Sequence, residues 1–236
     1  MKILGVDSSG LVASVAIVED DNLLAEYTVN YKKTHSQTLL PMLDEIVNMT
    51  EQQLEEVDAI AVAAGPGSFT GLRIGAATVK GLGLALEKPI VPVPTVDGLA
   101  YQLWGATDYI CPLMDARRKQ TYTGIYGFEE GRFVVHKEQC AVGIEEILAA
   151  VNDLGHPVIF LGDGVSVFAK DIEALCKVPY QFAPAHCNKQ SAAAVAALGL
   201  QYMQEGKVVS AAEFRPEYLR LSQAERERLE KEQKES

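Results

Sequence analysis

A pattern of three strand-like segments, with an aspartate ending the first, occurs twice in the chain. The aspartate is Asp7 in the first copy and Asp115 in the second. The segments span residues 2–6, 13–18 and 23–29 in the first copy, and 109–114, 121–128 and 132–138 in the second. Short apolar segments separated by turn residues predict antiparallel β-strands. We interpret the repetition as an internal duplication, which predicts an α/β fold of two similar lobes.

Helical periodicity follows the first group of strands. Apolar residues recur at helical spacing after residue 35 and again over 72–86. Because a proline inside a helix removes a hydrogen bond, Pro41 predicts a late start or a kink in the first of these helices. A chain of 236 residues is long enough for two lobes with separate cores. We therefore predict an N-terminal lobe at 1–104 and a C-terminal lobe at 105–211.

The stretch GPGSFTGLRIG, residues 65–75, joins a small apolar segment to a predicted helix. Glycines permit close backbone approach, and the amides at a helix N-terminus attract anions. Ser68 or Thr70 can cap the helix through a side-chain oxygen. The stretch thus predicts a strand-to-helix turn, with a phosphate site as the first hypothesis.

This stretch lacks the residues that standard phosphate loops use. A P-loop has a lysine after its last glycine, where this chain has Leu72 after Gly71. A dinucleotide fingerprint has a third glycine where Thr70 stands. Weak anion binding stays open, with Arg73 contributing either charge or a partner contact.

Composition limits the class of protein. The net charge of −11 argues against a surface that binds nucleic-acid phosphates by itself. No export signal and no apolar run of membrane-spanning length is visible, so we expect no membrane association. The four cysteines are widely spaced, which favours reduced thiols and a cytoplasmic location.

Common catalytic motifs are also missing from the sequence. There is no H-E-x-x-H and no pair of histidines four residues apart, the spacing for zinc on a helix. No G-x-S-x-G nucleophile elbow occurs. We predict no catalytic residue and no metal site belonging to this chain.

Two interpretations are open for the aspartates that end the first strand of each copy. Duplicated α/β ATPases place such residues near metal and phosphate. Asp7 and Asp115, with the turn Gly162, Asp163 and Gly164, are then a candidate degenerate nucleotide site. Alternatively, each carboxylate accepts hydrogen bonds from amides of the turn that follows it.

Glycines are unusually frequent along the predicted helix 72–86. Each interior glycine costs roughly 0.5–1 kcal/mol relative to alanine, so close packing must offset the loss. Gly71, Gly75 and Val79 keep one face of this helix small. Packing within the lobe and docking on another subunit are both open, and composition alone favours the former.

These segments together resemble a known family. The duplicated layout is similar to that of the actin, sugar kinase and Hsp70 ATPase (ASKHA) superfamily. Within it, the chain resembles the bacterial TsaB family, also called YeaZ, along nearly its whole length. The segments that carry this resemblance are ILGVDSS, HSQTLLPML, GPGSFTGLRIG, the GDG at 162–164 and RPEYLR near the end.

The resemblance implies a role in forming N6-threonylcarbamoyladenosine at position 37 of tRNAs that read codons beginning with A. It implies a TsaD-type catalytic partner and a TsaE-type ATPase, which use the metal and the ATP, so that this chain needs no cofactor. Contact with tRNA would occur only through the complex. Alone, the chain is expected to form a homodimer.

The resemblance further implies that partners dock on the two N-terminal-lobe helices, and that residues 212–236 return to that lobe. The predicted interface residues are Leu39, Leu43, Gly67, Gly71, Arg73, Gly75 and Val79. Two alternative functions are a metallopeptidase of the glycoprotease type and an ATP-binding module.

Overall fold

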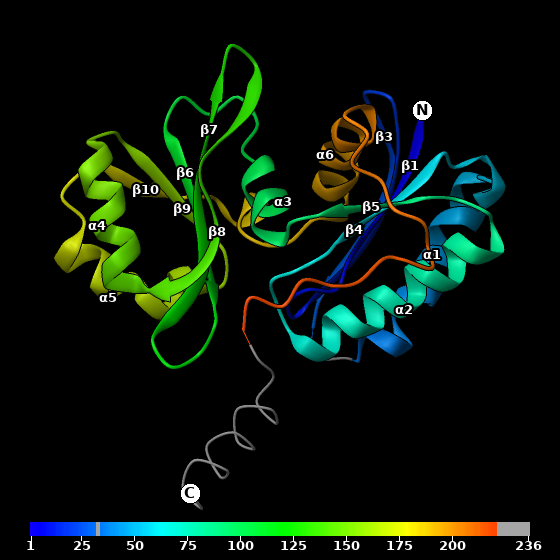
Figure 1. The fold of residues 1–236 in the computed structure, drawn as a ribbon, viewed down its shortest axis with the longest axis horizontal. Helices are drawn as coiled ribbons and strands as arrows, with labels where there is room; N and C mark the ends of the chain where they lie inside the picture. The colour runs from blue at the N-terminus through cyan, green and yellow to red at the C-terminus, as the bar shows by residue number, and fades with distance from the viewer. Residues whose placement is uncertain (32–33, 221–236) are drawn as a thin grey trace, which may run out of the picture.

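The computed structural model describes residues 1–31 and 34–220, which contain two five-stranded sheets (Figure 1). The strand order is β3-β2-β1-β4-β5 in the first sheet and β8-β7-β6-β9-β10 in the second. The strands are β1 (Lys2–Asp7), β2 (Val12–Glu19), β3 (Asn22–Asn30), β4 (Ala59–Ala63), β5 (Ile90–Val93), β6 (Tyr109–Asp115), β7 (Gln120–Glu129), β8 (Arg132–Gly143), β9 (Val158–Leu161) and β10 (Tyr180–Phe182). Equivalent strands hold equivalent places, which confirms the predicted duplication and two-lobe α/β fold.

Strand pairing is also the same in the two sheets. The first three strands of each copy are antiparallel, and the last two add in parallel. Asp7 lies opposite Ser14 and Asp115 lies opposite Thr121, so both aspartates end the central strand of a sheet. Since ligands of open α/β sheets bind at the carboxyl ends of the strands, both aspartates lie where such a sheet would bind a ligand.

Along the chain, most of the helices connect two strands that run parallel to each other. They are η1 (His35–Gln37), α1 (Leu39–Thr50), η2 (Leu54–Glu56), α2 (Phe69–Ala85), α3 (Thr95–Tyr101), α4 (Ile144–Leu154), α5 (Gly164–Leu175), η3 (Ala185–Cys187) and α6 (Ala192–Gln204). The late start predicted from Pro41 is confirmed, because α1 begins at Leu39 and Pro41 falls in its first turn, where no amide partner is lost.

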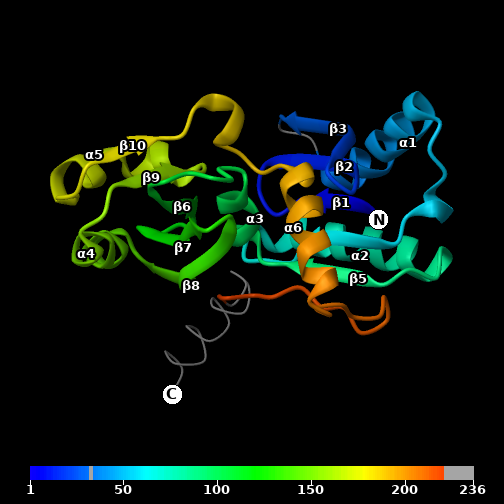
Figure 2. The same ribbon diagram turned by 90° about the horizontal axis from the view of Figure 1, so that it is seen from above.

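Helices α3 and α6 are exchanged between the lobes. Each is the last helix of its copy, and both lie between the two sheets (Figures 1 and 2). Val96 and Leu99 of α3 pack in a core with Ile110 and Tyr126 of the second sheet. In contrast, α6 packs on β1, β4 and β5 of the first sheet. The predicted division placed α6 within 105–211, whereas its contacts belong to the first sheet.

After α6 the chain runs back along the first lobe. Val209 forms an antiparallel bridge with Ile90 of β5, and Phe214 is buried in the core between the first sheet and α1–α2. We call residues 209–220 the C-terminal strap. The rest of the predicted returning segment, 221–236, lies outside the described residues.

Candidate functional site

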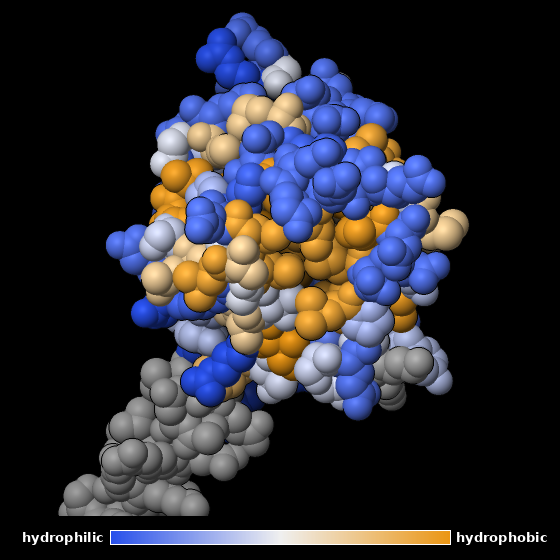
Figure 3. Space-filling view, turned by 90° about the vertical axis from the view of Figure 1, so that its right-hand side faces the viewer, coloured by the Kyte–Doolittle hydropathy of each residue, from blue (hydrophilic) through white to orange (hydrophobic). Residues whose placement is uncertain are grey.

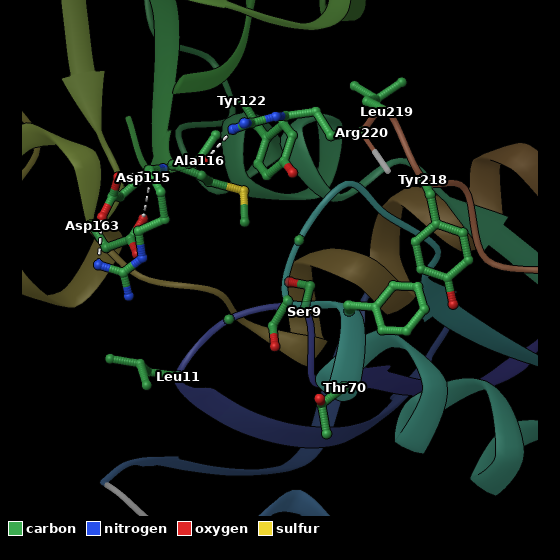
Figure 4. A pocket seen from close by; sticks show the side chains of 16 residues that line it. Ser9, Leu11, Thr70, Asp115, Ala116, Tyr122, Asp163, Tyr218, Leu219 and Arg220 are labelled. Carbon is green, nitrogen blue, oxygen red and sulfur yellow. Dashed lines mark hydrogen bonds and ion pairs between the residues drawn. The ribbon is translucent and has the colours of Figure 1, made fainter. Parts of the chain in front are cut away.

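A cavity of about 550 Å³ lies between the lobes, beyond the carboxyl ends of β1 and β6 (Figure 4). Six segments line it: the turn after β1, the turn and start of α2, the end of β6 with the turn that follows, β7, the turn after β9 and the end of the strap. The lining residues are Ser9, Gly10, Leu11, Gly67, Ser68, Phe69, Thr70, Met114, Asp115, Ala116, Arg117, Tyr122, Asp163, Tyr218, Leu219 and Arg220.

The two duplicated aspartates hold the turns that follow them. The Oδ1 atom of Asp7 accepts hydrogen bonds from the Ser9 amide at 2.8 Å and from the Ser9 hydroxyl at 2.7 Å. In the second lobe, Oδ1 of Asp115 accepts from the Arg117 amide at 2.8 Å. Both carboxylates therefore bind the amide two residues ahead, the role described by the turn-capping interpretation.

The environments of the two aspartates differ. Asp7 is 2% exposed and lies behind the cavity wall, where burial raises its pKa to about 6 although the Ser9 hydrogen bonds oppose the shift. Asp115 lines the cavity and pairs with the Arg117 guanidinium, with 3.0 Å between Oδ2 and Nη1. Only the second-lobe aspartate can therefore meet a molecule in the cavity directly.

The glycines of the 162–164 turn serve close packing. A Cβ on Gly162 or Gly164 would lie 2.3 or 2.8 Å from the carbonyl oxygen of Leu113 in β6. Asp163 lines the cavity, and its Oδ1 accepts a hydrogen bond from the Asp115 amide at 3.3 Å. Of the five candidate nucleotide-site residues, the structure thus brings only Asp115 and Asp163 to the cavity.

The GPGSFTGLRIG stretch forms the predicted strand-to-helix turn. The Ser68 hydroxyl oxygen accepts a hydrogen bond from the Gly71 amide at 3.3 Å, so the predicted cap is confirmed. The Ser68 amide donates to the Ser9 carbonyl oxygen at 2.7 Å, and a Cβ on Gly67 would lie 2.3 Å from that same oxygen. The stretch is consequently packed onto the turn after β1.

The strap closes one side of the cavity and contacts both lobes. The Glu217 amide donates to the Ala64 carbonyl at 2.7 Å, and the ring of Tyr218 lies 4.9 Å from that of Phe69. On the second lobe, the Gln139 side-chain amide donates to Glu217 Oε2 at 2.9 Å. The Arg220 guanidinium donates to the Ala116 carbonyl there. Sequence reasoning did not assign these contacts, and RPEYLR was their only signal.

Most of the predicted interface residues are internal. Leu39, Leu43 and Val79 are buried in the core of the first lobe. A Cβ on Gly71 would lie 2.1 Å from the Ser8 carbonyl oxygen, and one on Gly75 would lie 2.4 Å from the Ser8 hydroxyl. Gly67 is similarly packed on Ser9. The small face of α2 therefore covers the β1 turn, and these side chains are not free to meet a partner.

A different set of side chains faces outward on α2. We call Ala77, Gly81 and Leu84, which share one side of α2, the docking face; all three are exposed. Leu40 and Met49 of α1 are exposed too, but they are nine residues apart and therefore lie on opposite sides of that helix. Arg73 is also exposed on α2, with its guanidinium 4.1 Å above the Phe69 ring. Figure 3 shows apolar residues gathered on the side of the molecule that carries α1 and α2, with polar residues around them. Docking of a partner on these helices remains a prediction, but residues other than the buried ones would make the contact.

A buried polar cluster joins the exchanged helices. Asp97 of α3 accepts hydrogen bonds from the hydroxyls of Tyr126 in β7 at 2.8 Å and Tyr202 in α6 at 2.9 Å. Burial raises the pKa of Asp97, and the two hydrogen bonds oppose this shift. No sequence motif indicated this cluster, because its members come together only in the tertiary structure.

The described residues contain neither a metal-binding cluster nor a helix able to span a membrane. Across 1–31 and 34–220, no three His, Cys, Asp or Glu side chains are placed to hold a metal ion. Within the same ranges, no helix combines the length and apolarity needed to cross a membrane.

Comparison with known proteins gives the family. The model of the family described as "TsaD: tRNA N6-adenosine threonylcarbamoyltransferase" matches residues 22–228. The tRNA threonylcarbamoyladenosine biosynthesis protein TsaB of Bacillus subtilis is 31% identical over 225 residues, covering 95% of this chain and 96% of that protein. The chain belongs to the TsaB family. The match covers almost the whole TsaB protein, so both lobes and the strap are part of the shared sequence.

Solved structures agree with the TsaB assignment and with the fold. The structure of YeaZ from Pseudomonas aeruginosa has a TM-score of 0.77 at 25% identity, covering 92% of this chain and 99% of that one. The ROK hexokinase of Thermus thermophilus has a TM-score of 0.50 at 11% identity, covering 87% and 100%. The second likeness concerns the fold alone and confirms the predicted two-lobe fold of the sugar-kinase type.

Proposed function

We propose that this chain is a non-catalytic subunit in the formation of N6-threonylcarbamoyladenosine at position 37 of tRNA. It would act in the cytoplasm with a TsaD-type transferase and a TsaE-type ATPase, which use the metal and the ATP. The main support for the proposal is the match to the Bacillus subtilis protein TsaB, which is named for this pathway. The match covers 95% of this chain. This chain also matches the TsaD family model, which supports a TsaD-type partner with a fold similar to that of this chain.

Reconstitution tests this role. The purified chain alone should leave an unmodified tRNA transcript unchanged, as measured by mass spectrometry of the digested nucleosides. Adding it to TsaD, TsaE and a source of threonylcarbamoyl-adenylate should raise the yield of modified nucleoside. Equal yield without the chain would exclude an accessory role.

The docking face is the proposed contact with the TsaD-type subunit and, in its absence, with a second copy of the chain. Leu84 is the large apolar side chain of this face and is 62% exposed. An exposed apolar patch rimmed by polar residues is typical of an interaction surface.

Charge substitutions on the docking face test this contact. The double variant Ala77→Glu, Leu84→Glu should bind the TsaD-type subunit at least roughly tenfold more weakly, because carboxylates would be buried in an apolar interface. Calorimetry measures the affinity, and the melting temperature should stay unchanged. Val167→Glu on α5, where Val167 is 54% exposed, is the control. If the double variant bound the TsaD-type subunit with wild-type affinity, the interface would lie elsewhere on the molecule.

Nucleotide binding in the cavity is a second candidate. The position of the cavity beyond β1 and β6, with Asp115 and Asp163 in its wall, favours this function over the peptidase alternative. Titration calorimetry with ATP, on the isolated chain and on the complex, distinguishes an ATP site on this chain from one on a partner subunit. Binding only to the complex would assign the nucleotide to a partner subunit.

A further inference from the structure

The last strands of the two sheets, β5 and β10, hold equivalent places in the duplicated fold. A proline precedes each strand, and its carbonyl oxygen accepts a hydrogen bond at 3.0 Å from the neighbouring parallel strand. The pairs are Ile60 with Pro89 in the first lobe and Val158 with Pro179 in the second. The residue after each proline lies opposite the same donor, so Ile90 and Tyr180 are equivalent positions.

The outer edge of β5 is closed. Alternate residues of an edge strand direct their backbone groups away from the neighbouring strand, and in β5 these are Ile90 and Pro92. The Ile90 amide donates to the Val209 carbonyl at 2.9 Å, and the Val209 amide donates to the Ile90 carbonyl at 2.9 Å. Pro92 has no amide hydrogen to offer. The strap and the proline thus supply the protection that natural sheet edges need.

The outer edge of β10 lacks both forms of protection. Tyr180 and Phe182 stand where β5 has Ile90 and Pro92, and Phe182 keeps its amide hydrogen. In the part of the chain that the structure describes, no segment pairs with β10 on this side. The strand carries no charged side chain that would discourage pairing. Its outward amides and carbonyls are therefore available to another strand.

The side chains beside this edge are apolar and exposed. Tyr180 and Phe182 are 38% and 45% exposed, and their ring centroids lie 5.6 Å apart. The Tyr180 ring also lies 6.0 Å from that of Phe160, which is buried in the core beneath α4 and α5. The two rings extend that core to the surface. An added strand would cover them, as Val209 extends the core around Ile90 in the first lobe.

We propose that an extended segment of a partner protein pairs with β10 in antiparallel direction, as the strap pairs with β5. A second copy of this chain would offer its own strand of three residues, which buries far less than the roughly 1,200–2,000 Å² of a stable interface. A peptide segment instead gains its affinity from main-chain hydrogen bonds and a few side-chain contacts. Figures 1 and 2 show β10 in the second lobe and α2 in the first, so both surfaces can be occupied together.

The strap indicates the chemistry of the segment. Its residue opposite Tyr180 is β-branched and apolar, like Val209, and the residues on either side of it are uncharged, like Val208 and Ser210. That residue exchanges two hydrogen bonds with Tyr180, and the Phe182 amide donates to a carbonyl two residues earlier in the segment. The inference goes beyond the proposed function and does not depend on it.

A peptide copied from the strap tests the edge. The probe is residues 206–212, acetylated and amidated, titrated into the full isotope-labelled chain and followed by the amide signals in NMR spectra. The signals of Tyr180 and Phe182 should shift and saturate, whereas that of Ile90 should stay in place. The control peptide carries Val209→Pro, which removes the amide that donates to Tyr180, and it should produce no saturating shift.

Two variants of the chain separate the backbone contact from the side-chain contact. Phe182→Pro copies the protection of β5, and Phe182→Val also removes the ring but keeps the amide hydrogen. The proline variant should bind the probe roughly fivefold more weakly than the valine variant, because it lacks one hydrogen bond. Their melting temperatures should agree, since this amide faces away from β9.

Three results would overturn the proposal. If the probe shifts Ile90 and leaves Tyr180 unchanged, it competes with the strap for β5. If Tyr180 and Phe182 show no saturating shift, or if the proline and valine variants bind the probe equally, the β10 edge does not accept a strand. If their signals move with protein concentration when no probe is present, a second copy occupies the edge in place of a partner.

Discussion

The duplicated aspartates show how one residue type keeps its local role while its environment changes. Asp7 and Asp115 each accept a hydrogen bond from the amide two residues ahead. This role could be predicted from the turn residues that follow each strand. The burial of Asp7 could not, because it depends on α2 and on the turn after β4, which the sequence does not place beside β1.

The raised pKa of Asp7 predicts a pH-dependent effect of Asp7→Asn. The pKa is about 6 in the folded protein against 3.8 for an ordinary aspartate carboxyl, so the folded state loses stability as pH rises between these values. Asparagine keeps the acceptor oxygen for Ser9 and never ionises. The variant should gain up to about 3 kcal/mol over wild type at pH 7.5, and little at pH 4. Urea denaturation at both values measures this gain, and a difference that does not change with pH would contradict the assignment.

Two glycines of α2 should respond oppositely to alanine. Gly71→Ala should destabilise the fold by roughly 1–3 kcal/mol, because its Cβ would lie 2.1 Å from the Ser8 carbonyl oxygen. Gly81→Ala should stabilise it by about 0.5–1 kcal/mol, because Gly81 is mid-helix with open space around its Cβ position. Thermal and chemical denaturation compare the pair. Equal effects would show that the packing described for α2 is incorrect.

At the scale of elements, periodicity identified the helices but not what covers them. The sequence showed that one face of α2 is small, and the structure shows that the turn after β1 fills it. The outward face, with Gly81 and Leu84, could be found only once the inward one was known. The short strand β10 (Tyr180–Phe182) was not predicted, because three residues are too few for a pattern.

The Asp97 cluster holds three elements together and yields a prediction at this scale. Asp97→Ala leaves the hydroxyls of Tyr126 and Tyr202 buried without their acceptor, which should cost about 3 kcal/mol. Tyr202→Phe, which removes one hydrogen bond and keeps the other, should cost about 1 kcal/mol. Guanidinium denaturation of both variants checks the order, and a smaller loss for Asp97→Ala would argue against a shared acceptor.

At the scale of the whole molecule, the fold class and the family were predictable because they depend on motifs spread along the chain. The interlobe contacts were not, since Glu217 meets Ala64 and Arg220 meets Ala116 across large sequence separations. The cavity was anticipated through Asp115 and Asp163, and through the candidate phosphate turn, whose residues Gly67, Ser68 and Thr70 also line it. Its strap-derived wall, with Tyr218 and Arg220, comes from long-range packing that has no local signature.

The strap predicts how the two lobes are held together. The double variant Tyr218→Ala, Arg220→Ala removes the ring contact with Phe69 and the hydrogen bond to Ala116. Amide hydrogen exchange should become faster at the α2 start and at the β6–β7 hairpin, which face the cavity from opposite lobes. Glu213→Ala, which affects only a contact within the strap, is the control. Unchanged exchange at both places would mean that the strap does not restrain the lobes.

The exchange of α3 and α6 makes each copy of the repeat depend on the other. Each copy ends in a helix that covers the sheet of the other copy. A copy on its own would therefore expose an apolar sheet face to water. Fragments cut between residues 104 and 105 should accordingly be insoluble apart and complement each other when produced together.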